Sequence, residues 1–177
     1  MPSGEKIVLA YMSIGEAEEY RFYRKSGWRP GNPSWLHDEN PDWSGNYKVH
    51  YGEAAWQDII LQYVDRLLDA GFRGEYLDLV DAYVHYRNRG RAMAAVETVR
   101  LVGRIAERVR ARDPGVVILI QNAAELAGAF PEILEIVDGV GQEDIHYGYV
   151  DEDVMTPVTV TDETKSWLDV FLHAGKP

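Results

Sequence analysis

The sequence predicts an α/β fold with a parallel sheet, either doubly wound or a (β/α)8 barrel, and this chain of 177 residues contains about four βα units. Short apolar runs rich in β-branched and aromatic residues alternate with helix-period segments, which is typical of parallel strands joined by right-handed helical crossovers. Each apolar run also ends in polar side chains. In such folds the functional groups lie at the carboxyl ends of the strands.

The first predicted strand is KIVLAYMSI, residues 6–14, a continuous apolar run that indicates burial on both faces and ends at Gly15. Residues 16–50 follow as a polar and aromatic stretch broken by prolines. We expect a functional loop here, because structureless loops of this size are uncommon. Its aromatic side chains either stack on the apolar faces of sugar rings or only anchor the loop, and they are Trp28, Trp35, Trp43, Tyr47 and Tyr51.

The rest of the chain repeats the alternation. Apolar periodicity predicts a helix over residues 53–71 that closes on Gly71, then the strand GEYLDLVDAY over 74–83. A second amphipathic helix covers 91–112, followed by strands at 116–122 and 138–145. The last helix is expected to begin at Thr161 as N-cap, with Glu163 in its first turn. The predicted order is βαβαβαβα, in one domain spanning residues 1–177.

All four predicted strands end in polar side chains: Ser13 and Glu16, Asp78 and Asp81, Gln121 and Asn122, and Glu143 and Asp144. Parallel strands bring these groups to one rim, where a pair of carboxylates can divide the work of glycosidic cleavage. Asp78 and Glu143 are the candidates. Any single aspartate can instead cap a helix or form an ion pair, as Asp81 can with Arg87 or Arg89.

Composition narrows the function classes. The formal net charge of −11 disfavours binding to nucleic acid or to an anionic membrane. The five histidines are scattered, and cysteine is absent, so thiolate metal sites are excluded and no cofactor is expected. Phosphate-binding glycine motifs and the serine nucleophile elbow are missing. A magnesium site built from the rim carboxylates is an alternative. The N-terminus lacks the pattern of a signal peptide, and no apolar segment is long enough to span a bilayer.

Four segments, YMSIGEAEEYR, GEYLDLVDAY, LIQN and GVGQEDIHYG, together resemble the endo-α-1,4-polygalactosaminidase-like enzymes of glycoside hydrolase family 114. The resemblance extends from about Lys6 to His173. It implies a TIM-type barrel, no cofactor, and hydrolysis of α-1,4-linked galactosaminyl polysaccharides, whose free amines would suit an acidic protein. Members are often secreted.

Carried over to this chain, the resemblance assigns the catalytic carboxylates to Asp78 and Glu143. Positions implied to bind substrate or orient the catalytic groups are Tyr11, Ser13, Glu18, Arg21, Asp81 and Asn122, and the loop aromatic Trp43 is added as a stacking candidate. Leu79 departs from the pattern, because polysaccharide-cleaving members often have asparagine there.

A complete (β/α)8 barrel takes about 250 residues, so this chain is predicted to hold a partial barrel, incomplete at both ends. An open parallel sheet exposes edges and an apolar face. We therefore expect the fragment to form a homo-oligomer or to be the ordered part of a larger barrel. The alternative function is a non-catalytic carbohydrate-binding or assembly module that keeps the rim without turnover.

Overall fold

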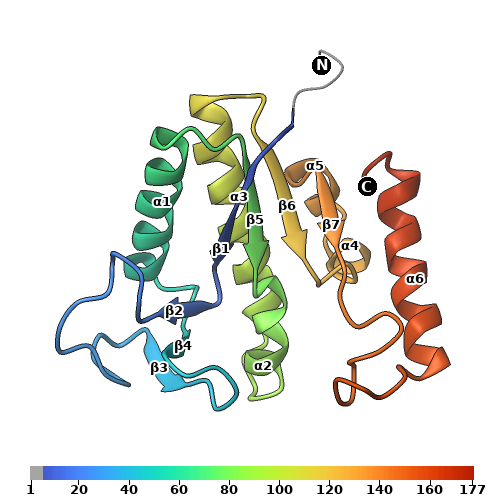
Figure 1. The fold of residues 1–177 in the computed structure, drawn as a ribbon, viewed down its shortest axis with the longest axis horizontal. Helices are drawn as coiled ribbons and strands as arrows, with labels where there is room; N and C mark the ends of the chain where they lie inside the picture. The colour runs from blue at the N-terminus through green and yellow to red at the C-terminus, as the bar shows by residue number, and fades with distance from the viewer. Residues whose placement is uncertain (1–5) are drawn as a thin grey trace.

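The structure is a computed structural model that describes residues 6–177 (Figure 1). Four parallel strands form its main sheet in the order β1 (Leu9–Ser13), β5 (Gly74–Asp78), β6 (Val117–Gln121) and β7 (Gly139–Gly141). The strand arrows all point to the lower edge of the sheet in Figure 1. The predicted α/β fold with a parallel sheet is confirmed. Residues 1–5, which belong to the N-terminal segment that lacks the signal-peptide pattern, lie outside the described residues.

The register brings the strand ends together. Ser13 pairs with Asp78 across β1 and β5, and Gln121 pairs with Gly141 across β6 and β7. Because neighbouring parallel strands lie about 4.8 Å apart, residues that follow these pairs share one rim. The polar groups that the sequence placed after each strand therefore converge.

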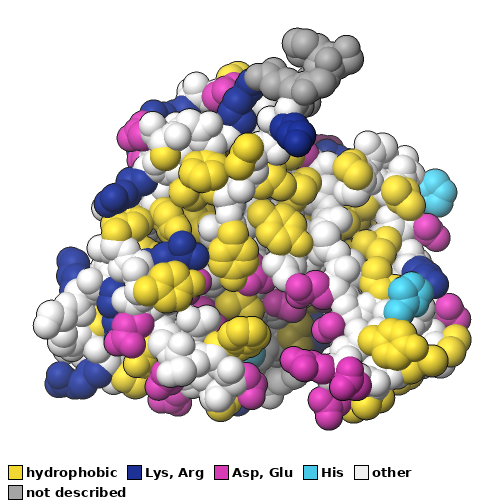
Figure 2. Space-filling model, viewed as in Figure 1, with side chains coloured by type: hydrophobic (Ala, Val, Ile, Leu, Met, Phe, Trp, Pro, Cys, Tyr) yellow, Lys and Arg dark blue, Asp and Glu magenta, His cyan; other side chains and the backbone are white. Residues whose placement is uncertain are grey.

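Only one face of the sheet is covered by helices. Ala10 and Met12 of β1 are buried beneath the helix layer, whereas Tyr11 between them is 45% exposed on the opposite face. The prediction that the first strand is buried on both faces was therefore wrong. Within the described residues, no second layer covers the open face. Figure 2 shows hydrophobic side chains spread across it.

The main helices are α1 (Ala54–Asp69) and α3 (Ala94–Arg112), which lie behind the sheet in Figure 1. Trp56 and Ile60 of α1 are fully buried, as the apolar periodicity predicts. The predicted closure at Gly71 is confirmed: this residue has φ of 90°, and its N–H donates to the carbonyl of Leu68. The N–H of Phe72 reaches the carbonyl of Leu67, which completes a Schellman motif.

Residues 16–50 are not the structureless loop that the sequence predicted. They form a three-stranded antiparallel sheet in the order β2 (Glu16–Glu18), β4 (Asn46–Val49) and β3 (Leu36–Glu39). The strands have three or four residues each and are separated by proline- and glycine-rich turns. Such short segments carry too little alternation to reveal a strand. This small sheet stands beside the rim of the main sheet in Figure 1.

Short helical segments follow β5 and β6: η1 (Val80–Ala82), α2 (Tyr83–Arg87), α4 (Leu126–Ala129) and α5 (Ile133–Ile136). The last helix, α6 (Val158–His173), begins earlier than predicted, with Pro157 rather than Thr161 at its N-cap. The carbonyl of Pro157 accepts the first hydrogen bonds of this helix, from the N–H groups of Val160 and Thr161 at 2.9 and 3.0 Å. The Thr161 hydroxyl instead donates to the carbonyl of Ile145 at 2.7 Å. Within residues 6–177, no helix has both the length and the apolar character required to cross a membrane.

Candidate active site

A cavity of about 590 Å³ opens at the carboxyl ends of β1, β5 and β6, between the main sheet and the small antiparallel sheet. Figure 2 shows acidic side chains gathered along this lower edge. The cavity is large enough for a small ligand. Its walls are formed by Tyr11, Glu16, Glu18, Tyr20, Asn40, Trp43, Asn46, Asp78, Leu79, Asp81, Gln121, Asn122 and Glu143.

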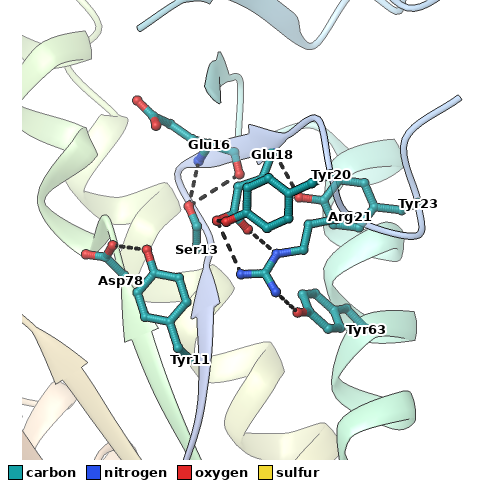
Figure 3. A network of polar contacts seen from close by, with 9 residues as sticks. All are labelled: Tyr11, Ser13, Glu16, Glu18, Tyr20, Arg21, Tyr23, Tyr63 and Asp78. Atoms are coloured by element: carbon teal, nitrogen blue, oxygen red, sulfur yellow. Dashed lines mark hydrogen bonds and ion pairs between the residues drawn. The ribbon is translucent and has the colours of Figure 1, made fainter. Parts of the chain in front are cut away.

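Asp78 ends β5, and both of its carboxylate oxygens have donors. The Tyr11 hydroxyl donates to Oδ2 (Figure 3). The N–H of Leu79 donates to Oδ1 at 2.6 Å. Burial raises the pKa of Tyr11 above its ordinary value, and the hydrogen bond to Asp78 adds to the rise, so Tyr11 remains a donor. The arrangement holds a carboxylate in a fixed orientation at the rim.

Glu143 reaches the same cavity from beyond β7 and is held by Asn122. The N–H of Glu143 donates to Asn122 Oδ1 at 3.0 Å, and Asn122 Nδ2 lies 3.4 Å from Glu143 Oε2. The side chain of Gln142 also donates to Asn122 Oδ1 at 3.0 Å. Glu143 is exposed, whereas Asp78 is half-buried. The two predicted catalytic carboxylates thus line one cavity in different environments.

Left-handed backbone marks three neighbouring strand ends. Leu79 after β5 has φ of 57°, Asn122 and Ala123 after β6 have 60° and 61°, and Asp144 after β7 has 58°. Residues other than glycine rarely adopt this left-handed backbone conformation, and backbone strain of this kind clusters at functional sites. Asparagine tolerates it better than leucine. Leucine in place of asparagine at position 79 therefore also puts a less tolerant residue into this left-handed conformation.

Glu18 on β2 is buried at the cavity wall and forms the centre of a polar network (Figure 3). Arg21 donates from Nε to Glu18 Oε2 at 2.5 Å and from Nη1 to the Tyr63 hydroxyl at 2.7 Å. The Tyr20 hydroxyl donates to the same carboxylate, and the N–H of Glu18 donates to the Tyr23 hydroxyl at 3.1 Å. Arg21 is outside the cavity lining, so it fixes Glu18 from behind.

Ser13 and Asp81 occupy different kinds of position. Ser13 is buried outside the cavity lining, where its hydroxyl accepts the N–H of Glu16 at 3.2 Å and shapes the turn from β1 into β2. Asp81 lines the cavity. Burial, and after it the nearby carboxylates of Asp78, Glu125 and Glu143, together raise its pKa to about 6.

The alternative ion pairs of Asp81 do not form in the structure. Arg89 instead donates to the backbone carbonyl of His85 at 3.2 Å, and the Arg87 guanidinium lies 5.4 Å from the centre of the Tyr83 ring. Asp81 is therefore left facing the cavity among other carboxylates.

The aromatic side chains of residues 16–51 separate into two groups. Trp35 is 3% exposed and packs edge-on against Trp28, and Tyr51 is buried with its hydroxyl donating to the carbonyl of Ala94. These three are anchors of the small sheet. Trp43 is 68% exposed and lines the cavity, which leaves its ring free to contact a ligand.

Sequence reasoning missed the asparagines that the small sheet contributes to the cavity. Asn40 follows β3 and donates to Glu16 Oε1 at 2.8 Å, and Asn46 begins β4. Burial raises the pKa of Glu16 despite the lowering effect of Asn40. The proline- and glycine-flanked segment NPDWSGN contained both residues, but only the antiparallel pairing turns them toward the rim.

The described part of the chain, residues 6–177, contains no group of three or more histidine, aspartate or glutamate side chains arranged to hold a metal ion. Of the rim carboxylates that the magnesium alternative invoked, Asp78, Asp81 and Glu143 line the cavity, and Asp144 lies outside its lining.

Comparison of the sequence with known proteins identifies relatives that are longer than this chain. A protein of Deinococcus radiodurans is 46% identical over 139 residues, which are 78% of this chain and 44% of the relative. Proteins of Thermotoga maritima and Methanocaldococcus jannaschii are 35% and 36% identical and cover 96% and 97% of the chain, but only 52% and 50% of their own lengths are matched. All three are uncharacterized. The chain spans about half the length of these curated relatives.

Two solved structures share the fold. The glycoside hydrolase domain of PelA from Pseudomonas aeruginosa has a TM-score of 0.67 at 19% identity, covering 96% of this chain and 64% of the domain. Aspergillus fumigatus Ega3, solved in complex with galactosamine, has a TM-score of 0.68 at 21% identity, covering 97% and 59%. The family model of glycoside-hydrolase family GH114 matches residues 2–177. This chain belongs to glycoside-hydrolase family GH114.

Proposed function

We propose that the protein is a glycoside hydrolase that cleaves an α-1,4-linked galactosaminyl polysaccharide with two carboxylates. The observation that carries the proposal is that Asp78 and Glu143, from the ends of two different strands, line one cavity. Glycosidic cleavage needs such a pair, because one group protonates the leaving oxygen while the other attacks or activates water.

The surroundings of the two carboxylates suggest a division of roles. Asp78 accepts hydrogen bonds from Tyr11 and from the N–H of Leu79, which hold its carboxylate in one orientation. We assign it the part of nucleophile or base. Glu143 is exposed and is contacted mainly through Asn122, and we assign it the part of general acid.

The remaining predicted residues fall into two groups: some line the cavity, and others lie behind its lining. Asp81, Glu18, Asn122 and Tyr11 line the cavity, and we propose that they bind the sugar or orient the carboxylates. Ser13 and Arg21 act indirectly, by shaping the turn into β2 and by holding Glu18. The GH114 membership and the acidic cavity favour an amine-bearing sugar, since a cation gains from the net charge of −11.

The test is release of reducing ends from α-1,4-galactosaminan, in partly and fully deacetylated form, by the complete protein and by its Glu143→Gln variant. We expect release by the wild type and a loss of about three orders of magnitude in the variant. Binding of the polymer without release by either protein would contradict the proposal. It would favour the carbohydrate-binding or assembly module instead. Loss of activity with a chelator would favour the magnesium alternative.

A second experiment examines Trp43. Replacement by alanine removes a ring that is 68% exposed at the cavity, so polymer affinity should fall about tenfold with little change in melting temperature. Unchanged affinity together with a lower melting temperature would mean that the ring only anchors the turn between β3 and β4.

The open sheet face leads to a proposal about partners. Ile7, Val8 and Tyr11 are 38%, 60% and 45% exposed on or beside β1, an uncovered edge of the sheet. We propose that a second copy or further barrel strands cover this face, because exposed edges and apolar faces favour pairing. A sharp monomer mass of this chain in light scattering would contradict the dimer.

A further inference from the structure

A separate cavity, of about 690 Å³, lies between the small antiparallel sheet and α2, and we call it the β3–α2 cavity. Its walls come from β3, β4, α2 and the loops beside them, in the lower part of Figure 1. Among the described residues, none lines both this cavity and the candidate active site. A cavity of this size accommodates a small molecule. Its charged and titratable lining residues are His37, Asp38, Glu39, Lys48, His85 and Arg89.

The charges of the two cavities differ. The lining of the candidate active site contains carboxyl groups but no lysine, arginine or histidine, and these carboxyl groups are Glu16, Glu18, Asp78, Asp81 and Glu143. The β3–α2 cavity combines two carboxyl groups with Lys48, Arg89 and two histidines. An anion is therefore repelled from the active site, whereas the β3–α2 cavity offers it positive partners.

Hydrogen-bond donors line the side of the β3–α2 cavity formed by β4 and α2. Within residues 6–177, the ammonium of Lys48 forms no ion pair. Arg89 lies with Nη1 3.0 Å from His85 Nδ1, and because a guanidinium cannot accept a hydrogen bond, Nδ1 is the acceptor. Burial, and after it the charge of Arg89, lowers the pKa of His85 below its ordinary value, which favours the neutral ring. The ring proton of His85 then lies on Nε2, which becomes a third donor.

Hydrogen-bond acceptors line the opposite side, on β3. The Tyr86 hydroxyl donates its one proton to the carbonyl of Val49 at 2.8 Å, so it accepts from His37 Nδ1, which lies 3.1 Å away. When the His37 ring is neutral, its Nε2 is therefore an acceptor. Asp38 is exposed and forms no ion pair within the part of the chain that the structure describes. The carboxylate of Glu39 already accepts the N–H of Gly45 at 2.7 Å.

We infer that the β3–α2 cavity binds a small sugar acid, which is a hydroxylated ring that carries one carboxylate or phosphate group. The oxyanion accepts charge-assisted hydrogen bonds from Lys48 and Arg89 and a further one from His85, and the ring hydroxyls donate to Asp38 and His37. A neutral sugar would leave both cations without a partner. The inference does not depend on the proposed function, because the linings of the two cavities are separate.

Calorimetric titration of the complete protein tests the ligand class. The probes are galacturonic acid, galactose 6-phosphate, galactose and inorganic phosphate. We expect at least one of the two sugar acids to bind at least tenfold more tightly than galactose, and more tightly than inorganic phosphate. The acid that binds better identifies the oxyanion as a carboxylate or a phosphate. The inference is overturned if neither acid binds, or if galactose or inorganic phosphate binds as tightly as both acids.

Charge-matched variants locate the site. Lys48→Met and Arg89→Gln should each lower the affinity for the sugar acid about tenfold. Arg89 is exposed, so its variant should fold even if Lys48→Met does not. Lys25→Met and Arg87→Gln remove the same charges outside the cavity lining and should leave the affinity unchanged. Equal losses in the control variants would show a general charge effect and would overturn the inference.

Two further variants test the acceptor side and the choice of cavity. Asp38→Ala removes an acceptor for a hydroxyl and should weaken the sugar acid about threefold. A ligand bound through its charge alone would instead bind this variant more tightly, which would contradict the sugar acid. Trp43→Ala changes the candidate active site and should leave the affinity for the sugar acid unchanged. A loss in that variant would place the ligand in the active site and would overturn the inference.

Discussion

Two carboxyl groups on strand β5 have opposite surroundings. Asp78 lies at the strand end on the open face, where Tyr11 and the N–H of Leu79 donate to it. Glu75, three residues earlier, faces the helix layer, is fully buried, and has no hydrogen-bond partner for either oxygen. Burial raises the pKa of Glu75 to about 8, so at neutral pH it is mostly protonated. The chemistry of a carboxyl group on β5 therefore depends on its hydrogen-bond donors and its burial, because both groups belong to the same strand.

The largest expected effect is on turnover, and it is tested by neutralising Asp78 and Glu75 in separate variants. Asp78→Asn should reduce turnover by about three orders of magnitude or more with little change in melting temperature, because it removes a carboxylate that we propose to be catalytic. Glu75→Gln, which makes the same kind of change on the same strand, should keep the wild-type rate. Reducing-end assays and thermal melts of both variants check this. Equal losses in the two variants would mean that β5 tolerates neither change for structural reasons.

The second effect concerns stability as a function of pH. The folded state retains the Glu75 proton up to about pH 8, whereas the unfolded chain releases it near 4.5. The contribution of Glu75 to stability is therefore complete below about pH 4.5 and is lost as pH rises toward 8. Glu75→Gln should match the wild type at pH 5 and exceed it by roughly 3–5 kcal/mol at pH 9. Urea unfolding at both pH values measures this difference, and an equal difference at the two would contradict it.

A smaller effect should follow when Asp78 loses one donor. Tyr11→Phe removes the hydroxyl that donates to Asp78 Oδ2 and should lower kcat about tenfold. The exposed Tyr147 lies outside the lining of the candidate cavity, so Tyr147→Phe is the matched control. A Tyr11→Phe enzyme with the wild-type rate would show that the N–H of Leu79 is sufficient to hold the carboxylate.

The smallest effect concerns the turn after β5. Leu79 has φ of 57°, which asparagine adopts more readily than leucine. Leu79→Asn should stabilise the fold by about 1 kcal/mol, equivalent to about 2–4 °C in melting temperature. A lower melting temperature would show that packing of the leucine side chain outweighs the backbone strain.

Local patterns predicted much of the fold. Apolar periodicity located α1 and α3, Gly71 marked a helix end, and apolar runs located the four parallel strands. The small antiparallel sheet was missed because its strands are too short to show alternation, and burial on both faces of the first strand was wrongly predicted. The start of α6 was misplaced because Thr161 resembles an N-cap, although Pro157 occupies that position.

The candidate site likewise combines features that the sequence predicted with features that it did not. By itself, the sequence determined which polar side chains follow the strands, including Asp78 and Glu143, because the order of residues along a strand decides what stands at its end. Only the tertiary structure decided that Trp43 faces the cavity while Trp35 is buried, and that Arg21 holds Glu18 from behind. The physical reason is that exposure and hydrogen-bond partners arise from contacts between segments that are distant along the chain.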